Sequence, residues 1–288
     1  MNLPHSQKNS MAESTQTKEF LAKLISSRLK QQHQQAKHQY DSTKNRIGYF
    51  FVDDLLPVDI AKEIHRAFPR PEEMNLNKSL REHKHIAAQM DRHHPLLEQA
   101  IYAFQGAEVV SLIQSICGID KLEPDTNLYA GGISTMKKGQ FLNPHLDNSH
   151  DKDRNRWRVL NLLYYVNPNW ENGYGGDLEL WPEGVKGDPI AIPSSFNRLV
   201  VMATHQGSWH AVRPVQVDES RNCVSNYYFS PNPLRESDRF HVTTFRGWPH
   251  QRLKNGILKI DSTLRMGLRK LFRKGVIENP HVYKKNEE

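Results

Sequence analysis

The chain of 288 residues is long enough to bury a sizeable core, and one or two domains are expected. Charged residues make up 25% of it, no apolar run reaches the ~20 residues that a membrane-spanning helix needs, and the first residues lack the apolar stretch of a signal peptide. With only two cysteines, no disulfide framework or cysteine-based zinc site is indicated, and a reducing cytoplasm is the expected setting.

Helical patterns fill the first part of the chain. Apolar residues recur at helical spacing over residues 18–40, a second helix is predicted to begin near Pro57, and a third covers about 95–117 and stops at Gly118. The expected organisation is a disordered tail over 1–17, followed by a helical support region over 18–123.

From about residue 124 the pattern changes. Short runs rich in β-branched and aromatic residues alternate with turns that contain Gly, Pro, Asn or Asp. Regular short strands of this kind predict an antiparallel sandwich or barrel, which forms a β-rich core over 124–235. Residues 236–288 are expected to contain a connector and then a C-terminal helix.

The net charge of +7 is concentrated in that C-terminal region. Residues 252–274 contain eight Lys/Arg and one acid, Asp261, so this segment carries a charge equal to that of the whole chain. A basic amphipathic helix is predicted here, because one stripe collects Leu253, Ile257, Ile260, Leu264, Leu268 and Leu271.

One tripeptide in the strand region, His145-Leu146-Asp147, is a candidate for metal binding. In an extended strand, residues i and i+2 point to the same face, so His145 and Asp147 can present an imidazole and a carboxylate side by side. With one further histidine, such a pair can hold Fe(II) on one side and leave the opposite positions open. On its own, the tripeptide favours a polar loop in which Asp147 or Asn148 caps a turn.

Two histidines compete for the third ligand position. His210 begins a β-patterned run, whereas His205 stands beside a Gln-Gly turn and is expected to be exposed. Strand placement therefore favours His210. A separate cluster is interpreted as a solvated and mostly helical face, because it has no carboxylate at ligand-like spacing: His83, His85, His93 and His94.

Five elements stand in order over roughly residues 125–230: HLD, RVLNLLYYVNPNW, GGDLELWP, NRLVVMATHQGSWHAVRPV and SRNCVSNYYFS. This order resembles the prolyl-hydroxylase-like group of Fe(II)/2-oxoglutarate dioxygenases. The resemblance implies an α+β fold that is mainly β, a double-stranded β-helix (jelly roll) with helices packed against one side. It also implies that His145, Asp147 and His210 bind the iron, with 2-oxoglutarate and O2 as co-substrates in the hydroxylation of an unactivated C–H bond.

The far carboxylate of 2-oxoglutarate needs a buried cation, and arginine binds a carboxylate at two points. The spacing in this family points to Arg221, and Arg213 is the alternative. Arg221 can also be read as a solvent-facing turn charge paired with a nearby acid. Tyr165 matches a tyrosine that hydrogen-bonds the same carboxylate, although most strand tyrosines are core residues. Asn161 is a candidate for lining the same pocket.

Two further positions bear on the family pattern. Gly175-Gly176 match its glycine pair and are expected to form a tight turn. A tyrosine is often found on the strand before the His-x-Asp motif, and here Thr135 or Met136 falls near that place, so the contacts of 2-oxoglutarate on that wall depart from the pattern.

The basic C-terminal segment is the sequence's clue to the substrate. An apolar stripe flanked by Lys and Arg predicts a helix that lies on an anionic membrane surface through residues 252–274, and a packing helix with a solvated basic face is equally compatible. Nucleic acid is not expected, because the segment has one aromatic residue, Phe272, and no known binding module.

A membrane location favours a lipid-linked saccharide as substrate. With that substrate the chain resembles the bacterial hydroxylases of Kdo, the sugar acid of the lipid A inner core, and would be cytoplasmic and peripheral on the inner face of the cytoplasmic membrane. A prolyl or other protein side chain is the alternative substrate. Two other classes remain open: a non-catalytic jelly-roll binding module, and a zinc hydrolase with the same three ligands.

Overall fold

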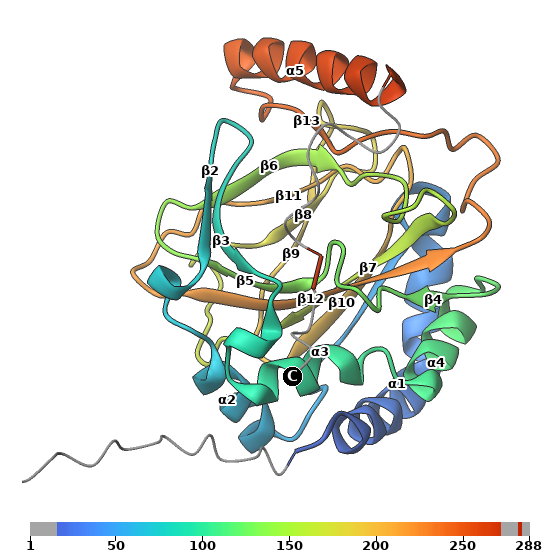
Figure 1. Ribbon diagram of the computed structural model, residues 1–288, viewed down its shortest axis with the longest axis vertical. Coiled ribbons are helices and arrows are strands. Elements are labelled where there is room, and N and C mark those ends of the chain that lie inside the picture. Colours follow the sequence, from blue (N-terminus) through green and yellow to red (C-terminus); the bar gives the residue numbers. More distant parts are fainter. Residues whose placement is uncertain (1–15, 272–281, 284–288) are drawn as a thin grey trace, which may run out of the picture.

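A curled antiparallel sheet forms the centre of the chain (Figure 1). The computed structural model describes residues 16–271 and 282–283. Residues 1–15 of the expected tail and the last three residues of the basic segment, 272–274, lie outside the described residues.

The sheet has two halves with interleaved strands. One half contains β1 (Tyr49–Val52), β10 (Arg198–Ala203), β7 (Trp157–Tyr165), β12 (Arg221–Ser230) and β5 (Gly132–Met136). The other contains β6 (Phe141–Leu146), β11 (His210–Val212), β8 (Leu178–Leu180) and β9 (Ile190–Ile192). Strands that follow one another in sequence mostly pair with distant strands, which is the arrangement of a jelly roll.

Short strands complete the sheet. Strand β3 (Glu82–Ala87) pairs with both β5 and β6 and so connects the two halves. The others are β2 (Asn75–Lys78) beside β3, β4 (Glu123–Pro124) beside β12, and β13 (Thr244–Phe245) beside β6. Part of the connector expected after residue 236 therefore forms a strand next to β6.

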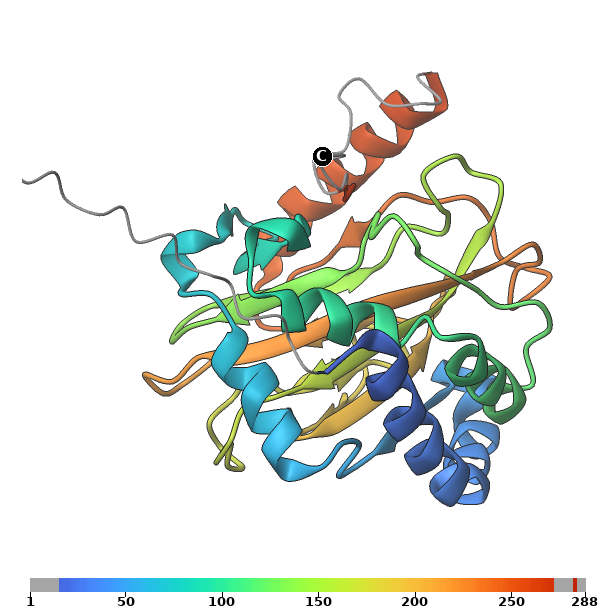
Figure 2. The same ribbon diagram turned by 60° about the horizontal axis from the view of Figure 1, so that its bottom comes forward.

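Helices cover the outer face of the first half (Figure 2). They are α1 (Lys18–Ile47), α2 (Val58–Ala67), α3 (Pro95–Ala103) and α4 (Ala107–Cys117), with the short 3-10 helices η1 (Pro71–Glu73) and η2 (Met90–Arg92). The first helix is longer than its apolar pattern predicts, and the helix predicted over 95–117 is broken at Phe104–Gly106. The predicted stop at Gly118 is present, with the left-handed φ of 64° that glycine adopts freely.

Side chains along each strand point alternately to the two faces of the sheet and so belong to two different buried clusters. On β7, Leu160, Leu162 and Tyr164 pack in the core beneath the helices, whereas Tyr165 belongs to a second cluster between the two halves of the sheet. This second cluster also contains Cys223 of β12, directly opposite Tyr165. Since side chains two apart share a face, Asn161 and Arg221 are on the same inner side.

The prediction of a helical face around residues 83–94 is wrong. His83 and His85 lie on β3, where they pair with residues of β6 and β5. His94 precedes α3, and its Nδ1 accepts a hydrogen bond from the backbone N–H of Leu96. Strand β3 has neighbours on both edges, so long-range pairing rather than local pattern determines its conformation.

Helix α5 (Arg252–Leu271) lies across the β6 and β13 end of the sheet (Figure 1). Its polar side faces the sheet: the Phe245 N–H donates to Ser262 Oγ, and Lys254 Nζ donates to Asn143 Oδ1. The predicted apolar stripe faces solvent instead, with exposed fractions of 82% for Leu253 and 63% for Leu264. Among the described residues no single helix has the length and apolarity to cross a bilayer, although the bent pair α3 and α4 meets that test together.

Candidate metal centre and pocket

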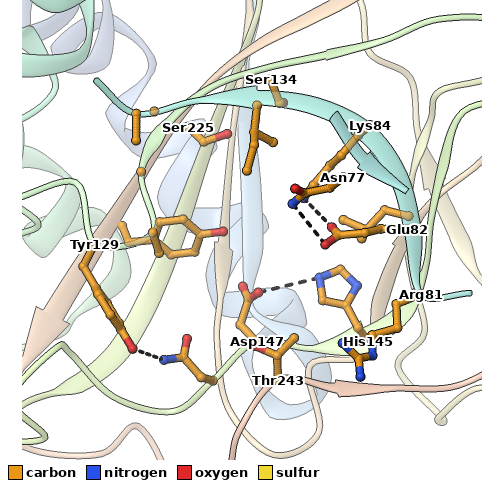
Figure 3. A pocket seen from close by; sticks show the side chains of 18 of the residues that line it. Asn77, Arg81, Glu82, Lys84, Tyr129, Ser134, His145, Asp147, Ser225 and Thr243 are labelled. Atoms are coloured by element: carbon orange, nitrogen blue, oxygen red, sulfur yellow. Dashed lines mark hydrogen bonds and ion pairs between the residues drawn. The ribbon is translucent and has the colours of Figure 1, made fainter. Parts of the chain in front are cut away.

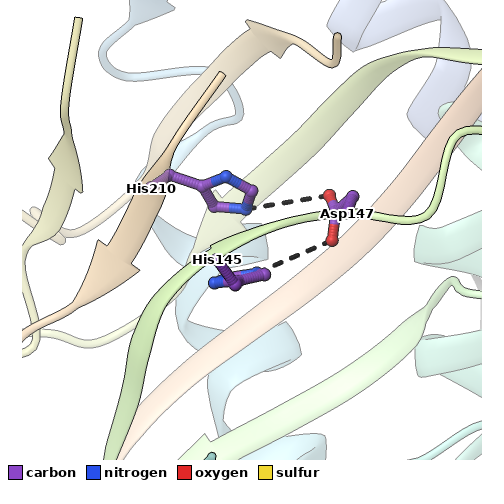
Figure 4. A group of neighbouring side chains, drawn as sticks. All are labelled: His145, Asp147 and His210. Carbon is purple, nitrogen blue, oxygen red and sulfur yellow. Dashed lines mark ion pairs between the residues drawn. The ribbon is translucent and has the colours of Figure 1, made fainter. Parts of the chain in front are cut away.

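Three side chains from neighbouring strands meet at one end of the curled sheet (Figure 4). His145 on β6 is paired directly with His210 on β11, and Asp147 follows the end of β6. His145 Nε2 lies 3.6 Å from Asp147 Oδ1, and His210 Nε2 lies 3.7 Å from Asp147 Oδ2. The potential ligand atoms of the three residues all lie within 4.8 Å of one another.

Backbone carbonyls fix the tautomer of both imidazoles. His145 Nδ1 lies 2.9 Å from the carbonyl oxygen of Asn143, and His210 Nδ1 lies 2.9 Å from that of Ser208. A carbonyl oxygen only accepts, so each Nδ1 must carry the hydrogen and donate it. Each Nε2 therefore keeps its lone pair on the side of Asp147, as a metal ligand requires.

The charges of the cluster suit a cation. Burial alone would raise the pKa of Asp147, but its contacts with the imidazoles of His145 and His210 and the charge of Arg158 hold this pKa well below its usual range. Burial, together with the neighbouring His145, lowers the pKa of His210 to about 4. At neutral pH the cluster thus contains an ionised carboxylate and a neutral His210.

The donor set fits a divalent transition metal. Two imidazoles and one carboxylate on a common face are typical of non-haem Fe(II), and zinc can use the same three ligands. Within the part of the chain that the structure describes, no other group of His, Cys, Asp or Glu has this spacing.

Arg158 is a neighbour of the cluster that the sequence reading missed. Its Nη1 lies 3.7 Å from Asp147 Oδ1, and its guanidinium lies 4.2 Å from the centre of the Tyr227 ring. The Nε of Arg158 is buried and has no hydrogen-bond partner. The available signal was one cation inside an apolar strand, WRVLNLLYY, since a buried charge in a strand needs a specific partner.

A pocket of about 450 Å³ opens over His145 and Asp147 (Figure 3). The ring of Phe245 is stacked against that of His145, with centroids 5.2 Å apart, and helps to fix the orientation of this imidazole. Most of the other lining side chains are polar or charged, among them Asn77, Arg81, Glu82, Lys84, Tyr129, Ser134, Ser225 and Thr243. A polar substrate group can therefore find hydrogen-bond partners on several walls.

Arg221 is buried on the inner side of β12, with 2% of its surface exposed. Its Nε donates to the carbonyl of Gly176 at 2.7 Å and to Ser194 Oγ at 2.9 Å. The guanidinium lies 4.8 Å from the centre of the Tyr165 ring, and the buried Tyr165 hydroxyl has no hydrogen-bond partner. No described residue forms an ion pair with Arg221, so the reading as a solvent-facing turn pair is wrong.

A buried guanidinium beside an unpartnered hydroxyl fits the carboxylate of an organic acid such as 2-oxoglutarate. The desolvated charge would gain a counter-ion, and the hydroxyl would gain an acceptor. Burial raises the pKa of Tyr165, so its hydroxyl keeps the proton that it would donate.

Gly176 and Ser194 are contacts of Arg221 that the sequence did not reveal. A Cβ on Gly176 would lie 2.6 Å from Arg221 Cδ, and the φ of Gly176 is +70°. Gly176 therefore does more than form the expected tight turn, because its carbonyl binds Arg221 and its missing side chain leaves room for that residue. Ser194 follows a proline in an ordinary turn sequence and carried no signal.

Arg213 lies outside this inner region, whereas Asn161 lies within it. Arg213 forms an ion pair with Glu179, and half of its side chain is exposed. Asn161 is beside the metal candidate, with Nδ2 3.5 Å from Asp147 Oδ2 and an unpartnered buried Oδ1. Thr135, one of the two residues near the missing family tyrosine, donates its hydroxyl to Asn222 Oδ1 instead.

His205 is buried, contrary to the expectation of an exposed turn residue. Its Nδ1 accepts a hydrogen bond from the backbone N–H of Gly207 at 2.9 Å. Burial, helped by Arg235, lowers the pKa of His205 to about 3. His205 is not part of the group formed by His145, Asp147 and His210.

Comparison with known proteins identifies the class of this site. Residues 131–229 match the model of the 2OG-Fe(II) oxygenase superfamily, so the chain contains a 2OG-Fe(II) oxygenase family domain. This segment includes the three clustered residues together with Arg221 and Tyr165. The expected enzyme class and the expected iron and 2-oxoglutarate are thus confirmed at the level of the family domain.

Individual proteins resemble parts of the chain in sequence or in fold. Mouse prolyl 3-hydroxylase OGFOD1 is 29% identical over 143 residues, which are 48% of this chain and 24% of the relative. The chain thus matches about a quarter of that protein's length. A prolyl 4-hydroxylase structure from Phytophthora capsici has 17% identity and a TM-score of 0.53, and the match covers 88% of this chain and 79% of that one. A Pseudomonas putida prolyl-4-hydroxylase has 20% identity and a TM-score of 0.49, with 67% and 97% covered. The Phytophthora structure confirms the expected jelly-roll fold.

Proposed function

We propose that the chain is an Fe(II)/2-oxoglutarate-dependent dioxygenase that hydroxylates an unactivated C–H bond, with His145, Asp147 and His210 as the iron ligands. The observation that carries this proposal is the convergence of two Nε2 atoms and one carboxylate within 4.8 Å, inside a 2OG-Fe(II) oxygenase family domain. Bound iron, together with 2-oxoglutarate and O2, would supply the oxidising chemistry.

The protein residues contribute ligands, orientation and charge. The carbonyls of Asn143 and Ser208 hold the two imidazoles with Nε2 available for the metal. Arg221, with Tyr165, would bind the far carboxylate of 2-oxoglutarate, and Gly176 and Ser194 hold the Arg221 side chain in place. Asn161 would act beside Asp147, where it can orient the carboxylate.

The release of succinate from 2-oxoglutarate tests the reaction class. The full chain with Fe(II) should produce succinate, and a His145→Ala/Asp147→Ala variant should lose this activity. Arg221→Ala should weaken binding of 2-oxoglutarate by at least about tenfold, because one charge-assisted contact contributes 1.5–3 kcal/mol, about 1.4 kcal/mol being tenfold. Arg213→Ala is the matched control, since it removes an equal charge at the surface. Equal activity of the double variant and the natural chain would contradict the ligand assignment.

We infer that the preferred substrate is a lipid-linked saccharide, such as the Kdo of lipid A. The polar lining of the pocket supports this choice, because a sugar ring presents hydroxyls that need partners on several sides. Asn77, Glu82 and Lys84 come from one hairpin and offer both donors and acceptors. A proline ring has no comparable need.

We further propose that α5 binds an anionic membrane surface, which would place the protein peripherally on the inner face of the cytoplasmic membrane. The exposed apolar residues support this, since Leu253, Ile260 and Leu264 face solvent with more than half of their surface free. Exposed cations, Arg252 and Lys259, stand on the same helix. An apolar stripe beside basic residues is suited to the boundary between acidic headgroups and acyl chains.

Sedimentation with lipid vesicles tests this membrane role. Full-length protein should sediment with vesicles of phosphatidylglycerol and phosphatidylcholine, and much less with phosphatidylcholine alone. An Ile260→Ser/Leu264→Ser variant should lose binding without loss of stability, because both side chains are already exposed. Leu76→Ser is a control on an apolar residue outside α5 that is 50% exposed. Unchanged sedimentation of the double variant would reject the proposal.

A protein side chain is the second candidate substrate. The specific observation in its favour is the 29% identity with mouse prolyl 3-hydroxylase OGFOD1 over 143 residues. Incubation with lipid A precursors and with proline-containing peptides, followed by mass spectrometry for one added oxygen of about 16 Da, separates the two candidates. Modification of peptides alone would reject the saccharide.

A further inference from the structure

One wall of the pocket over His145 and Asp147 is rich in arginine. Arg81, in the turn between β2 and β3, projects beside His145 (Figure 3). Arg265 and Arg269 reach the same pocket from α5, which lies over this end of the sheet. The three arginines come from two segments that are far apart in sequence, and they line one common space.

The acids nearby do not balance these cations. Arg81 Nε and Arg265 Nε both donate to the same oxygen, Asp261 Oδ2, at 3.0 Å. One carboxylate therefore serves two guanidiniums. Arg269 forms no ion pair with an acid among the residues that the structure describes, although its backbone carbonyl accepts a bond from Arg154. The opposite wall adds no excess of positive charge, because Lys84 forms an ion pair with Glu82 at 3.0 Å.

A buried donor in this wall lacks a partner. Arg265 Nη2 is buried and makes no hydrogen bond, although Arg265 Nε is used by Asp261. Burial and the neighbouring Arg81 lower the pKa of Arg265, so its positive charge is held at a cost. A charged donor left unpaired in a partly desolvated place is stabilised when an anion binds to it.

We propose that Arg81, Arg265 and Arg269 form a subsite in this pocket for an anionic group of the substrate, a phosphate or a carboxylate. The planar fork of arginine matches the oxygens of both groups. An anion held there would keep the attached carbon skeleton in the same pocket as His145 and Asp147. This subsite deepens the proposed function and rests on it for the identity of the reacting centre.

The subsite also gives α5 two different faces. Arg265 and Arg269 line the pocket, whereas Leu264 and Leu268 are exposed on the helix. An anionic headgroup near the apolar face would thus be close to the entrance of the pocket. The helix that contacts the lipid surface would also bind the charged part of the substrate.

Titration with glucose 1-phosphate tests the subsite directly. The full-length protein is studied by ligand-observed NMR, both metal-free and loaded with Mn(II), and glucuronate supplies the carboxylate arm. Glucose is the uncharged control and should not bind measurably. Arg269→Ala should weaken binding of the two anions about tenfold, since one charge-assisted contact is lost. Arg269 is chosen because no ion pair in the described structure depends on it.

Lys259→Ala is the matched control, because it removes one positive charge from an exposed position of the same helix. Equal weakening in Lys259→Ala and Arg269→Ala would mean that only the general charge of α5 matters, and would overturn the subsite. Absence of binding to the natural chain would overturn it as well.

The Mn(II) arm separates this proposal from the assignment of the metal ligands. Mn(II) at His145, Asp147 and His210 should shorten the 31P relaxation time of bound glucose 1-phosphate. If His210→Ala leaves this effect unchanged, the metal assignment is wrong, whereas anion binding that depends on Arg269 still supports the subsite. If Mn(II) and the anion both bind, but the 31P relaxation time of the anion does not change, the anion lies outside this pocket and the subsite is rejected.

Discussion

Gly176 and Arg221 illustrate how a single missing side chain can prepare a binding site. The carbonyl of Gly176 accepts from Arg221 Nε, and a Cβ at this position would lie 2.6 Å from Arg221 Cδ. The backbone and the buried cation therefore occupy adjoining space that no larger residue leaves free.

Gly176→Ala is expected to weaken binding of 2-oxoglutarate about tenfold or more, because Arg221 must move away from the added methyl group. Isothermal titration in the presence of Mn(II) measures the effect. Gly139→Ala is the control, since Gly139 has a similar φ of +77° and nothing within 4 Å of the added atom. A similar loss of affinity in both variants would assign the effect to backbone strain.

His205 is a buried base whose pKa is lowered to about 3, far below its value in an unfolded chain. Below pH 6.5 the unfolded state takes up a proton at this residue that the folded state does not. The free energy of unfolding should therefore fall by as much as about 1.4 kcal/mol per pH unit between pH 6.5 and about 3 because of this group.

Urea unfolding at pH 7, 6 and 5 checks this expectation. The slope of stability against pH should decrease in His205→Gln and stay unchanged in His38→Gln, which alters an exposed histidine of α1. An unaltered slope in His205→Gln would show that other groups cause the acid sensitivity.

At the scale of elements, local sequence pattern determines some helices and strands, and long-range strand pairing determines others. Helix α4 ends at Gly118 as predicted, because both the apolar period and the left-handed glycine are local properties. Strand β3 was missed, because its residues alternate weakly and its conformation depends on pairing with β5 and β6.

In the candidate site, too, some residues could be predicted from local sequence pattern and others could not. His145 and Asp147 could be grouped from strand period alone, and His210 from its position at the start of a strand pattern. Arg158 could be noticed as a cation inside an apolar strand, but its partner Asp147 could not be predicted. The contacts of Gly176 and Ser194 with Arg221 could not be predicted either, since they depend on which strands and turns lie opposite one another in space.

Helix α1 is expected to contribute stability rather than chemistry. Leu29 is fully buried against the helical core. Leu29→Ala should lower the free energy of unfolding by about 2–5 kcal/mol through lost burial and the cavity left behind. Denaturant unfolding measures this change, and Mn(II) affinity of the folded protein should stay unchanged. Phe20→Ala, at a position 45% exposed, is the control and should cost much less.

At the scale of the whole molecule, the proposed metal would join β6 and β11 with the segment that follows β6. A ligand that binds only the folded chain stabilises it, by about 2.7 kcal/mol at a concentration 100 times its dissociation constant. Added Mn(II) should therefore raise the melting temperature of the full chain, and EDTA should reverse the increase. His210→Ala should show neither effect. An equal increase in this variant would indicate binding at another site.

The direct pairing of His145 with His210 has a consequence for the order of events during synthesis. These two residues are 65 positions apart, and they become neighbours only when β11 adds to β6. A chain still emerging from the ribosome before residue 210 would possess an incomplete set of ligands. Iron could thus be bound by all three proposed ligands only after β11 has paired with β6. The nascent polypeptide would then not be exposed to oxidation at an incomplete iron site.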